Sequence, residues 1–346
     1  MKYNSRINNF DFMRLFLSIT IFLGHYAILS QHPDLNLILK YFDPELIVDA
    51  FFVISGFLIF LSYDNKPINK IYFKKRIKRI LPIYLISIIF FSFILLFFST
   101  KSVEDYFDIQ WFTYLYFNSI FLNFIQPNID GVFQNNPLQA VNGALWTLKL
   151  ELMFYFLVPI IFYIISKTNR LIVLITLYLL SIAYVLSIKY LYAQNPNPIY
   201  LTLLHQLPGK FSFFMMGAIL YFYHGYFKKN AIIYFIIAII IFYLNHQIDL
   251  YFLYPIALSI LVIYIATIMI NLGNWGKYGD FSYTIYVIHF PIIQIFISKG
   301  YIDQHPYLML IIILSLILTI SFFAWRYIEK PLMRGNWREM ISNSFR

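Results

Sequence analysis

The feature that most constrains this chain is a series of ten apolar runs, each close to the length that crosses a bilayer. A transmembrane helix needs about 20 mostly apolar residues, with a range of about 17 to 25. The runs occupy residues 10–30, 45–63, 80–99, 144–166, 170–190, 206–224, 231–246, 250–270, 280–299 and 307–329. They predict an all-α fold, that of a polytopic membrane protein with about ten transmembrane helices.

Composition supports lipid as the solvent. Hydrophobic residues make up 60% of the chain and charged residues only 12%, whereas soluble domains carry about 25% charged residues. Cysteine is absent, which excludes disulfides, thiolate metal sites and a cysteine nucleophile. The net charge of +10 would favour a nucleic-acid partner in a soluble protein. In a membrane protein the same excess is typical of cytoplasmic loops, so we expect membrane lipids as partners and no nucleic acid.

The distribution of basic residues predicts the orientation, because Lys and Arg accumulate in short cytoplasmic loops. The outside loops contain only Lys40, Lys101, Lys189 and Lys299 if the N-terminus is cytoplasmic. We therefore expect both termini in the cytoplasm and one membrane domain over residues 1–346, without an appended soluble domain. The basic residues expected in the cytoplasm are Lys2, Arg6, Lys66, Lys70, Lys74, Lys75, Arg76, Lys78, Arg79, Lys167, Arg170, Lys228, Lys229, Lys277, Lys330, Arg334, Arg338 and Arg346.

Segment 111–125 is apolar but short. The loops on either side, 101–110 and 126–143, are poor in Lys and Arg, so both are expected outside the cytoplasm. If the segment crossed the membrane, every later loop would change sides. We therefore expect it to lie in the interface or to re-enter, and its many aromatic residues suit such a position.

Ionisable side chains within the apolar runs are the first candidates for function, because each costs roughly 2.5 to 3.5 kcal/mol unless it is paired. The first run places Asp11, Arg14, Ser18 and His25 on one side of a helix. His25 can titrate near neutrality, so it can act as a general base or a nucleophile. The alternative is a structural histidine bonded to a neighbouring carbonyl group.

Glu151 is the second candidate. Its helix enters from outside, so Glu151 and His25 are expected at similar depths. A carboxylate beside an imidazole would fix its tautomer and stabilise the imidazolium, which is the role of the acid in a catalytic triad. The alternative is a structural ion pair of Glu151 with Lys149 or Lys210.

Arg76 and Arg79 are the third candidate, at the inner end of the third run. They are three residues apart, so on a helix they share a face and could clamp a polyphosphate. The alternative is that the run simply follows the preference for basic cytoplasmic loops and binds anionic lipid.

Several other polar residues are weaker candidates. His289 is as consistent with packing as with catalysis. Asp49 is a possible polar anchor near the outer face, and Ser55 with Gly56 favours close helix packing. Pore, substrate or snorkelling roles are open to His205, Lys210 and Arg326. No metal site is expected, because metal-ligand spacing is missing among His32, His224, His246 and His305.

Taken in order, six short motifs resemble the acyltransferase 3 family of integral membrane acyltransferases, which modify bacterial surface glycans and similar acceptors. The resemblance covers nearly the whole chain. The motifs are Asp11-Phe12-Met13-Arg14 with Gly24-His25, Phe51-Phe52-Val53-Ile54-Ser55-Gly56-Phe57-Leu58-Ile59, Arg76-x-x-Arg79, Leu145-Trp146-Thr147-Leu148 with Glu151 and Phe154-Tyr155, Ser282-Tyr283-Thr284-Ile285-Tyr286 with His289, and Glu329-Lys330-Pro331.

The resemblance implies an acyl-CoA donor, usually acetyl-CoA, bound on the cytoplasmic side near Arg76 and Arg79. It implies that His25 is the catalytic histidine, that Arg14 is its companion, and that Glu151 is the acid of the motif that holds Trp146 and Tyr155. The acceptor would be a glycan or lipid-linked sugar at the bacterial inner membrane, reached directly or through a separate periplasmic acyl-accepting protein.

Two residues depart from the family pattern. Lys149 stands where a small or neutral residue is usual, and Leu152 replaces a frequent second acid. Two other functions stay open, because a transporter or flippase for a glycan precursor would also have many helices and buried charge. A non-catalytic partner in glycan assembly is the other, although it would not explain the charged residues at His25, Arg14 and Glu151. The sequence does not predict an oligomeric state.

Overall fold

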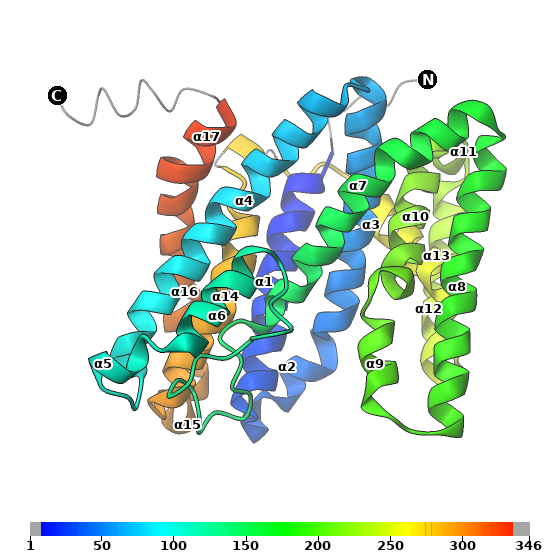
Figure 1. Cartoon of the computed structure of the whole chain (residues 1–346). Helices are drawn as coiled ribbons and strands as arrows, with labels where there is room; N and C mark the ends of the chain where they lie inside the picture. Colours follow the sequence, from blue (N-terminus) through cyan, green and yellow to red (C-terminus); the bar gives the residue numbers. More distant parts are fainter. Residues whose placement is uncertain (1–7, 274, 278, 335–346) are drawn as a thin grey trace. The chain divides into compact units, whose positions relative to one another are not determined.

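The computed structural model describes residues 8–273, 275–277 and 279–334, and every regular element in this part of the chain is helical (Figure 1). The predicted all-α membrane fold is confirmed, while the number of ten crossings stays a prediction. Six segments are long and apolar enough to cross a membrane, namely Phe10–Ser30, Pro33–Asn65, Asn69–Phe98, Gly143–Lys167, Arg170–Gln194 and Pro306–Met333. Outside the described residues lie Lys2, Arg6, Arg338 and Arg346, and the side chains of His246 and Arg334.

The chain forms two compact units, which are described separately. The first unit contains residues 1–13, 48–72 and 150–274, and the second contains residues 14–47, 73–149 and 275–346. Most of the first unit comes from one continuous stretch, whereas the second unit combines three distant parts of the sequence. The second unit therefore depends on contacts between residues that are far apart in the chain.

The long helices in the second half of the first unit do not pack in sequence order. Helix α10 contacts both α8 and α13, and α12 contacts α13 (Figure 1, green to yellow). The helices of this unit are α3 (Pro44–Asn65), α7 (Trp146–Lys167), α8 (Arg170–Gln194), α9 (Pro198–Leu204), α10 (Leu207–Phe222), α11 (His224–Lys229), α12 (Ala231–Gln247) and α13 (Tyr254–Thr267), where α3 and α7 begin in the second unit.

The second unit joins the start, the middle and the end of the chain. Helix α14 packs against α16, which a π-helical turn, Trp325–Glu329, continues. The other helices of this unit are α1 (Phe10–Ser30), α2 (Asn36–Tyr41), α4 (Asn69–Ile94), α5 (Val103–Tyr106), α6 (Ile109–Ser119), α14 (Ser282–Ser298), α15 (Tyr301–Gln304), α16 (Pro306–Ala324) and α17 (Lys330–Arg334), where α1 and α4 begin in the first unit.

Glycines permit the close packing of α3 on α10. A Cβ atom at Gly56 would lie 2.0 Å from the carbonyl oxygen of Phe214, and one at Gly217 would lie 2.2 Å from that of Val53. Both distances are shorter than any real contact, so only glycine fits at either position. The predicted close helix packing is found at Gly56, whereas the part given to Ser55 stays a prediction.

The observed helices differ from the apolar runs mainly at their ends. Helix α4 begins at Asn69, well before the run at 80–99, so Arg76 and Arg79 lie on the helix itself. Lys and Arg are good helix formers although they are not apolar, which explains the difference. Helix α6 has 11 residues, about 16 Å at 1.5 Å per residue. Since the hydrocarbon core is about 30 Å thick, α6 is too short to cross it alone.

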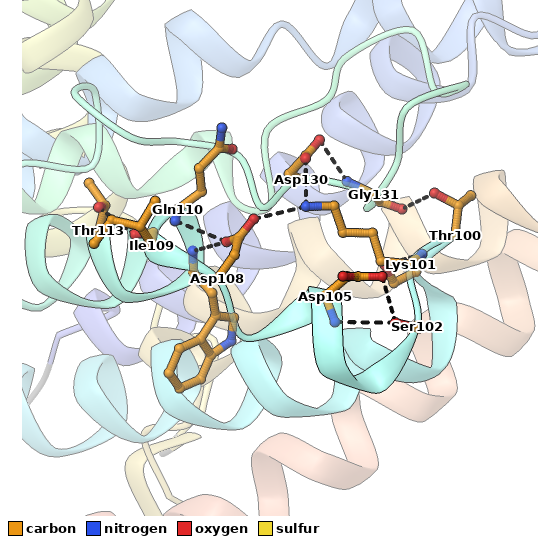
Figure 2. A network of polar contacts seen from close by, with 12 residues as sticks. Thr100, Lys101, Ser102, Asp105, Asp108, Ile109, Gln110, Thr113, Asp130 and Gly131 are labelled. Atoms are coloured by element: carbon orange, nitrogen blue, oxygen red, sulfur yellow. Dashed lines mark hydrogen bonds and ion pairs between the residues drawn. The ribbon is translucent and has the colours of Figure 1, made fainter.

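Lys101 forms ion pairs that connect α6 to the irregular segment after it. Its ammonium group lies 2.8 Å from Oδ2 of Asp108 and 2.7 Å from Oδ2 of Asp130 (Figure 2). Asp108 also caps α6, because its other oxygen accepts hydrogen bonds from the backbone N–H groups of Gln110 and Trp111. One lysine thus joins the first turn of α6 to the loop that contains Asp130.

Candidate active site

Two histidine side chains of the second unit lie within hydrogen-bond distance of each other. Nδ1 of His25 on α1 lies 2.9 Å from Nε2 of His289 on α14, although the residues are 264 positions apart. The two rings stack, with centroids 5.0 Å apart and planes inclined by 29°. His289 is fully buried, whereas His25 is partly exposed. The open question about His289 is therefore answered in part: it is a hydrogen-bond partner of the proposed catalytic histidine.

Pro291, two residues after His289, leaves a carbonyl group of α14 open for a hydrogen bond from the loop before α7. Pro291 has no N–H group, so it cannot bond to the carbonyl oxygen of Val287 one turn earlier. The side chain of Asn142 donates to that oxygen instead, at 2.7 Å. The freed carbonyl thus becomes the attachment point for the loop, and it lies within one turn of His289.

Gln294 makes a second attachment between this loop and α14. Its side-chain amide donates to the carbonyl oxygens of Leu138 at 2.5 Å and Ala140 at 2.9 Å. Its own oxygen accepts from the side chain of Asn136 at 2.9 Å. Gln294 and Asn136 are buried, so this polar network is satisfied inside the protein.

Two of the six motifs also contact each other. The hydroxyl groups of Thr147 and Tyr286 lie 2.5 Å apart, and the Tyr286 hydroxyl donates to the carbonyl oxygen of Ala144 at 2.8 Å. Tyr286 is three residues before His289 on α14. The Trp-Thr-Leu motif at the start of α7 therefore helps to hold the helix that carries His289.

Arg14 and Arg79 share one carboxylate. Oδ2 of Asp280 lies 3.1 Å from Nη1 of Arg14 and 2.7 Å from Nη2 of Arg79. Its other oxygen accepts a 2.6 Å hydrogen bond from the hydroxyl of Ser282. All three charged side chains are mostly buried, with exposures of 24%, 21% and 18%. Arg76 lies one turn before Arg79 on α4.

Asp280 was missed by reasoning from the sequence. Lys277 in the loop before α14 was counted as a basic cytoplasmic residue, whereas Asp280, three residues later, was not considered. A signal was available, because Asp280 lies two residues before the Ser282-Tyr283 motif and a strongly basic side of a membrane protein needs counter-ions.

The Glu329 motif holds the start of α14. The Thr284 hydroxyl donates to a carboxylate oxygen of Glu329, which is buried, and the Tyr283 hydroxyl donates to the carbonyl oxygen of Ile80 at 2.9 Å. Gly279 has a φ of +122° and lies against the indole of Trp325, where a Cβ would come within 2.6 Å. These contacts fix the segment that carries Asp280.

Glu151 lies in the first unit, where it accepts a hydrogen bond from the hydroxyl of Tyr155, one turn later on α7. Lys210, one of its considered partners, lies 2.9 Å from Asp49, and both side chains are only 4% exposed. Lys149, the other, lies in the second unit with its ammonium group 4.6 Å from the ring centroid of Phe124. The predicted effect of Glu151 on His25 stays a prediction.

The remaining candidate residues lie on several different helices. Asp11 lies in the first turn of α1, where a negative charge favours the helix dipole, and Trp146 opens α7. Nδ1 of His205 lies 2.7 Å from the carbonyl oxygen of Leu201, and the Arg326 guanidinium lies 5.9 Å from the ring centroid of Tyr327. Within the described ranges, no three His, Asp or Glu side chains form a group that could hold a metal ion.

Fold and site together define a class: an all-helical membrane protein with a hydrogen-bonded histidine pair and two arginines on one carboxylate. Residues 7–326 match the family described as "Acyltransferase domain". The chain therefore belongs to the acyltransferase 3 family, and it is a membrane acyltransferase. The resemblance predicted from the six motifs is confirmed.

Two named proteins are similar to this chain. The chain is 25% identical to "O-acetyl transferase" of Shigella phage Sf6 over 345 residues, which covers 94% of this chain and 96% of the relative. It is 28% identical over 175 residues to "Nodulation protein 10" of Rhizobium leguminosarum bv. viciae, with 47% of this chain and 46% of the relative covered. No solved structure matches the chain significantly.

Proposed function

We propose that the protein transfers an acyl group, with acetyl as the expected group, from cytoplasmic acyl-CoA to a hydroxyl of an extracytoplasmic or lipid-linked glycan. The observation that carries the proposal is the histidine pair of His25 and His289. Its partly exposed member lies on the same helix as Arg14, which shares Asp280 with Arg79. The full-length relative named O-acetyl transferase supports oxygen as the acceptor atom.

The spacing along α1 fits a donor of this shape. Arg14 and His25 are 11 residues apart, which is roughly 16 Å along a helix. The phosphates of CoA would lie near Arg14, Arg76 and Arg79, and the pantetheine arm would extend along α1 toward His25. The proposal includes ten crossings with both termini in the cytoplasm of a bacterial inner membrane, so that an inside donor can serve an outside acceptor.

The proposed reaction needs one base. His25 removes the proton of the acceptor hydroxyl while its oxygen attacks the thioester carbonyl carbon, and Arg14 stabilises the bound donor. The carbon–sulfur bond then breaks, and the CoA thiolate leaves with the proton that His25 returns. In the second form of the mechanism, His25 itself carries the acyl group before the acceptor takes it. In either form, the negative charge of Glu151 is proposed to favour the protonated state of His25.

The acceptor is proposed as a chemical class. Capsule, exopolysaccharide and lipopolysaccharide all present sugar hydroxyl groups outside the membrane, and a separate periplasmic protein could receive the acyl group first. Comparing the masses of surface glycans from cells with and without the gene would identify both the acyl group and the acceptor.

Labelled acetyl-CoA and extracted surface glycan, given to the purified protein in lipid nanodiscs, test the proposal. We expect release of free CoA together with label on the glycan. A transporter, a flippase or a non-catalytic partner would release no CoA, so that result would refute the enzyme.

The donor site has its own test with a matched control. Arg76→Ala with Arg79→Ala should raise the apparent KM for acetyl-CoA at least tenfold, because a charge-assisted contact to a phosphate is worth roughly 1.5 to 3 kcal/mol. Lys74→Ala with Lys75→Ala removes two exposed charges from the same helix and should leave KM nearly unchanged. An equal KM in both double variants would contradict the arginine clamp.

A further inference from the structure

The hydrogen bonds of the histidine pair determine which nitrogen of His25 carries a proton. We infer that His289 is a positioning residue that keeps His25 protonated at Nδ1 and leaves Nε2 with a free lone pair for the reaction. This inference rests on the proposed function for its chemical meaning, although its structural core can be tested without that function.

The first step concerns His289. Its Nδ1 lies 3.1 Å from the carbonyl oxygen of Ile285, one turn earlier on α14. A carbonyl oxygen can only accept a hydrogen bond, so Nδ1 of His289 must be the donor. In a neutral imidazole the second nitrogen then has no hydrogen, and Nε2 of His289 is an acceptor.

The second step concerns charge. His289 is fully buried, and no acidic side chain within ion-pair distance of its ring is found among the described residues. Burying a charge that has no counter-ion is very costly, so the neutral ring is the stable form of His289. Its Nε2 therefore accepts from the atom 2.9 Å away, which is Nδ1 of His25.

The third step gives the state of His25. A neutral ring that donates through Nδ1 has a lone pair at Nε2, which is what a general base or a nucleophile needs. The other tautomer would place two lone pairs against each other at 2.9 Å and lose the hydrogen bond.

The pair remains bonded throughout the proposed reaction. When Nε2 of His25 takes the proton of the acceptor hydroxyl, the resulting imidazolium still donates through Nδ1 to His289. The same Nε2 proton then passes to the CoA thiolate, which restores the neutral pair. His289 thus has the orienting role of the acid in a Ser-His-Asp triad, and it needs no negative charge inside the membrane.

The tautomer can be measured directly. The protein has seven histidines, and nitrogen-15 labelling of their rings distinguishes protonated from bare nitrogens by NMR in nanodiscs. The signals of His25 are those that disappear in His25→Gln. We expect Nδ1 protonated and Nε2 bare in the wild type, and a larger fraction of rings protonated at Nε2 in His289→Phe. A wild type protonated at Nε2, or a His289→Phe protein with an unchanged tautomer, would overturn the inference.

Activity gives a second readout. His289→Gln retains an oxygen that can accept from His25, so it should keep kcat within about tenfold, whereas His289→Phe should lower kcat about 10²- to 10⁴-fold with the KM for acetyl-CoA unchanged. Equal losses in the two variants would overturn the positioning role. Absence of acyl transfer by the wild type would refute the proposed function alone, because the tautomer measurement still decides the role of His289.

Discussion

The carboxylate of Asp280 accepts a 2.7 Å hydrogen bond from the guanidinium of Arg79, a residue 201 positions earlier in the chain. The same oxygen atom lies 3.1 Å from Arg14. One acid thus links helices α1 and α4 to the segment just before α14. It also balances part of the positive charge of Arg14 and Arg79, near which we propose that the donor phosphates bind. Any anion that binds these arginines competes with Asp280.

Replacing Asp280 should lower the stability of the protein but increase the stabilising effect of CoA. Asp280→Asn leaves Arg14 and Arg79 without their shared negative charge, so the free energy of unfolding should fall by about 2 kcal/mol. Added CoA should raise the midpoint of thermal unfolding more in the variant than in the wild type, because its phosphates replace the lost carboxylate.

Asp249→Asn is the control for this comparison. It removes an ion pair of the same length, 2.7 Å, from an exposed position beside Lys189, where such pairs contribute about 0 to 1 kcal/mol. Equal stability of the two variants, or an equal effect of CoA on both, would show that Asp280 does not hold the arginines together.

The pair of Lys210 and Asp49 predicts a strong dependence of each residue on the other. Both side chains are 4% exposed, so Lys210→Met removes the cation that binds a buried carboxylate and should cost about 3 to 5 kcal/mol. Adding Asp49→Leu removes that charge and should restore most of the loss. A double-mutant cycle on the unfolding free energies measures the coupling, and simple additivity of the two losses would contradict the buried pair.

Glycine spacing in the first unit predicts a position-specific effect on stability. Gly56→Ala places a Cβ 2.0 Å from the Phe214 carbonyl oxygen, so α3 and α10 must separate, at a cost of about 1 to 3 kcal/mol. Gly225→Ala is the control, because a Cβ there meets nothing within 4 Å. Thermal unfolding of the purified variants checks the difference, and a Gly56→Ala protein as stable as Gly225→Ala would refute the close packing.

Hydropathy was sufficient to find the main helices but not their contacts. The run at 10–30 coincides with α1, and 170–190 lies within α8, because an apolar run of this length has few structures open to it in lipid. The start of α4 was placed too late because hydropathy does not register Lys and Arg as helix formers. Short helices such as α9 and α11 give no distinct apolar signal and were not predicted.

Site residues could be selected from the sequence, whereas their partners could not. His25 and Arg14 stood out because an ionisable group in an apolar run is rare. The partner of His25 is 264 positions away, and helical periodicity contains no information at that range. Depth matching pointed to Glu151 alone, although the same reasoning applied to His289 would have added a second candidate.

The ion pairs of Lys101 with Asp108 and Asp130 predict a pH range in which the loop that contains Asp130 is ordered. Hydrogen bonds from Lys101 lower the pKa of Asp108 and of Asp130, and the bonds to these two acids raise the pKa of Lys101. The contribution of the acids is present above their unfolded pKa of about 3.9 and is lost as pH falls through the folded values. That of Lys101 is present below about 10.4 and is lost as pH rises through its raised value.

Hydrogen exchange of residues 126–143 measures this order. Exchange should be slow between about pH 4 and pH 10.4, after correction for the intrinsic rate, and Lys101→Met should accelerate it at pH 7. Lys189→Met, which removes a lysine from an exposed pair elsewhere, should leave this loop unchanged. Equal exchange in Lys101→Met and the wild type would show that the loop is held by its other contacts alone.

The most direct test of the account is acyl transfer in cells that carry His25→Gln. Surface glycans from cells with the wild-type gene, with His25→Gln, and without the gene are compared by mass spectrometry, and membrane abundance of the protein is measured in each strain. We predict that the acyl substituent is present only with the wild type, while His25→Gln protein accumulates normally in the membrane. Acylated glycan in the His25→Gln strain at the wild-type level would contradict the central role of His25.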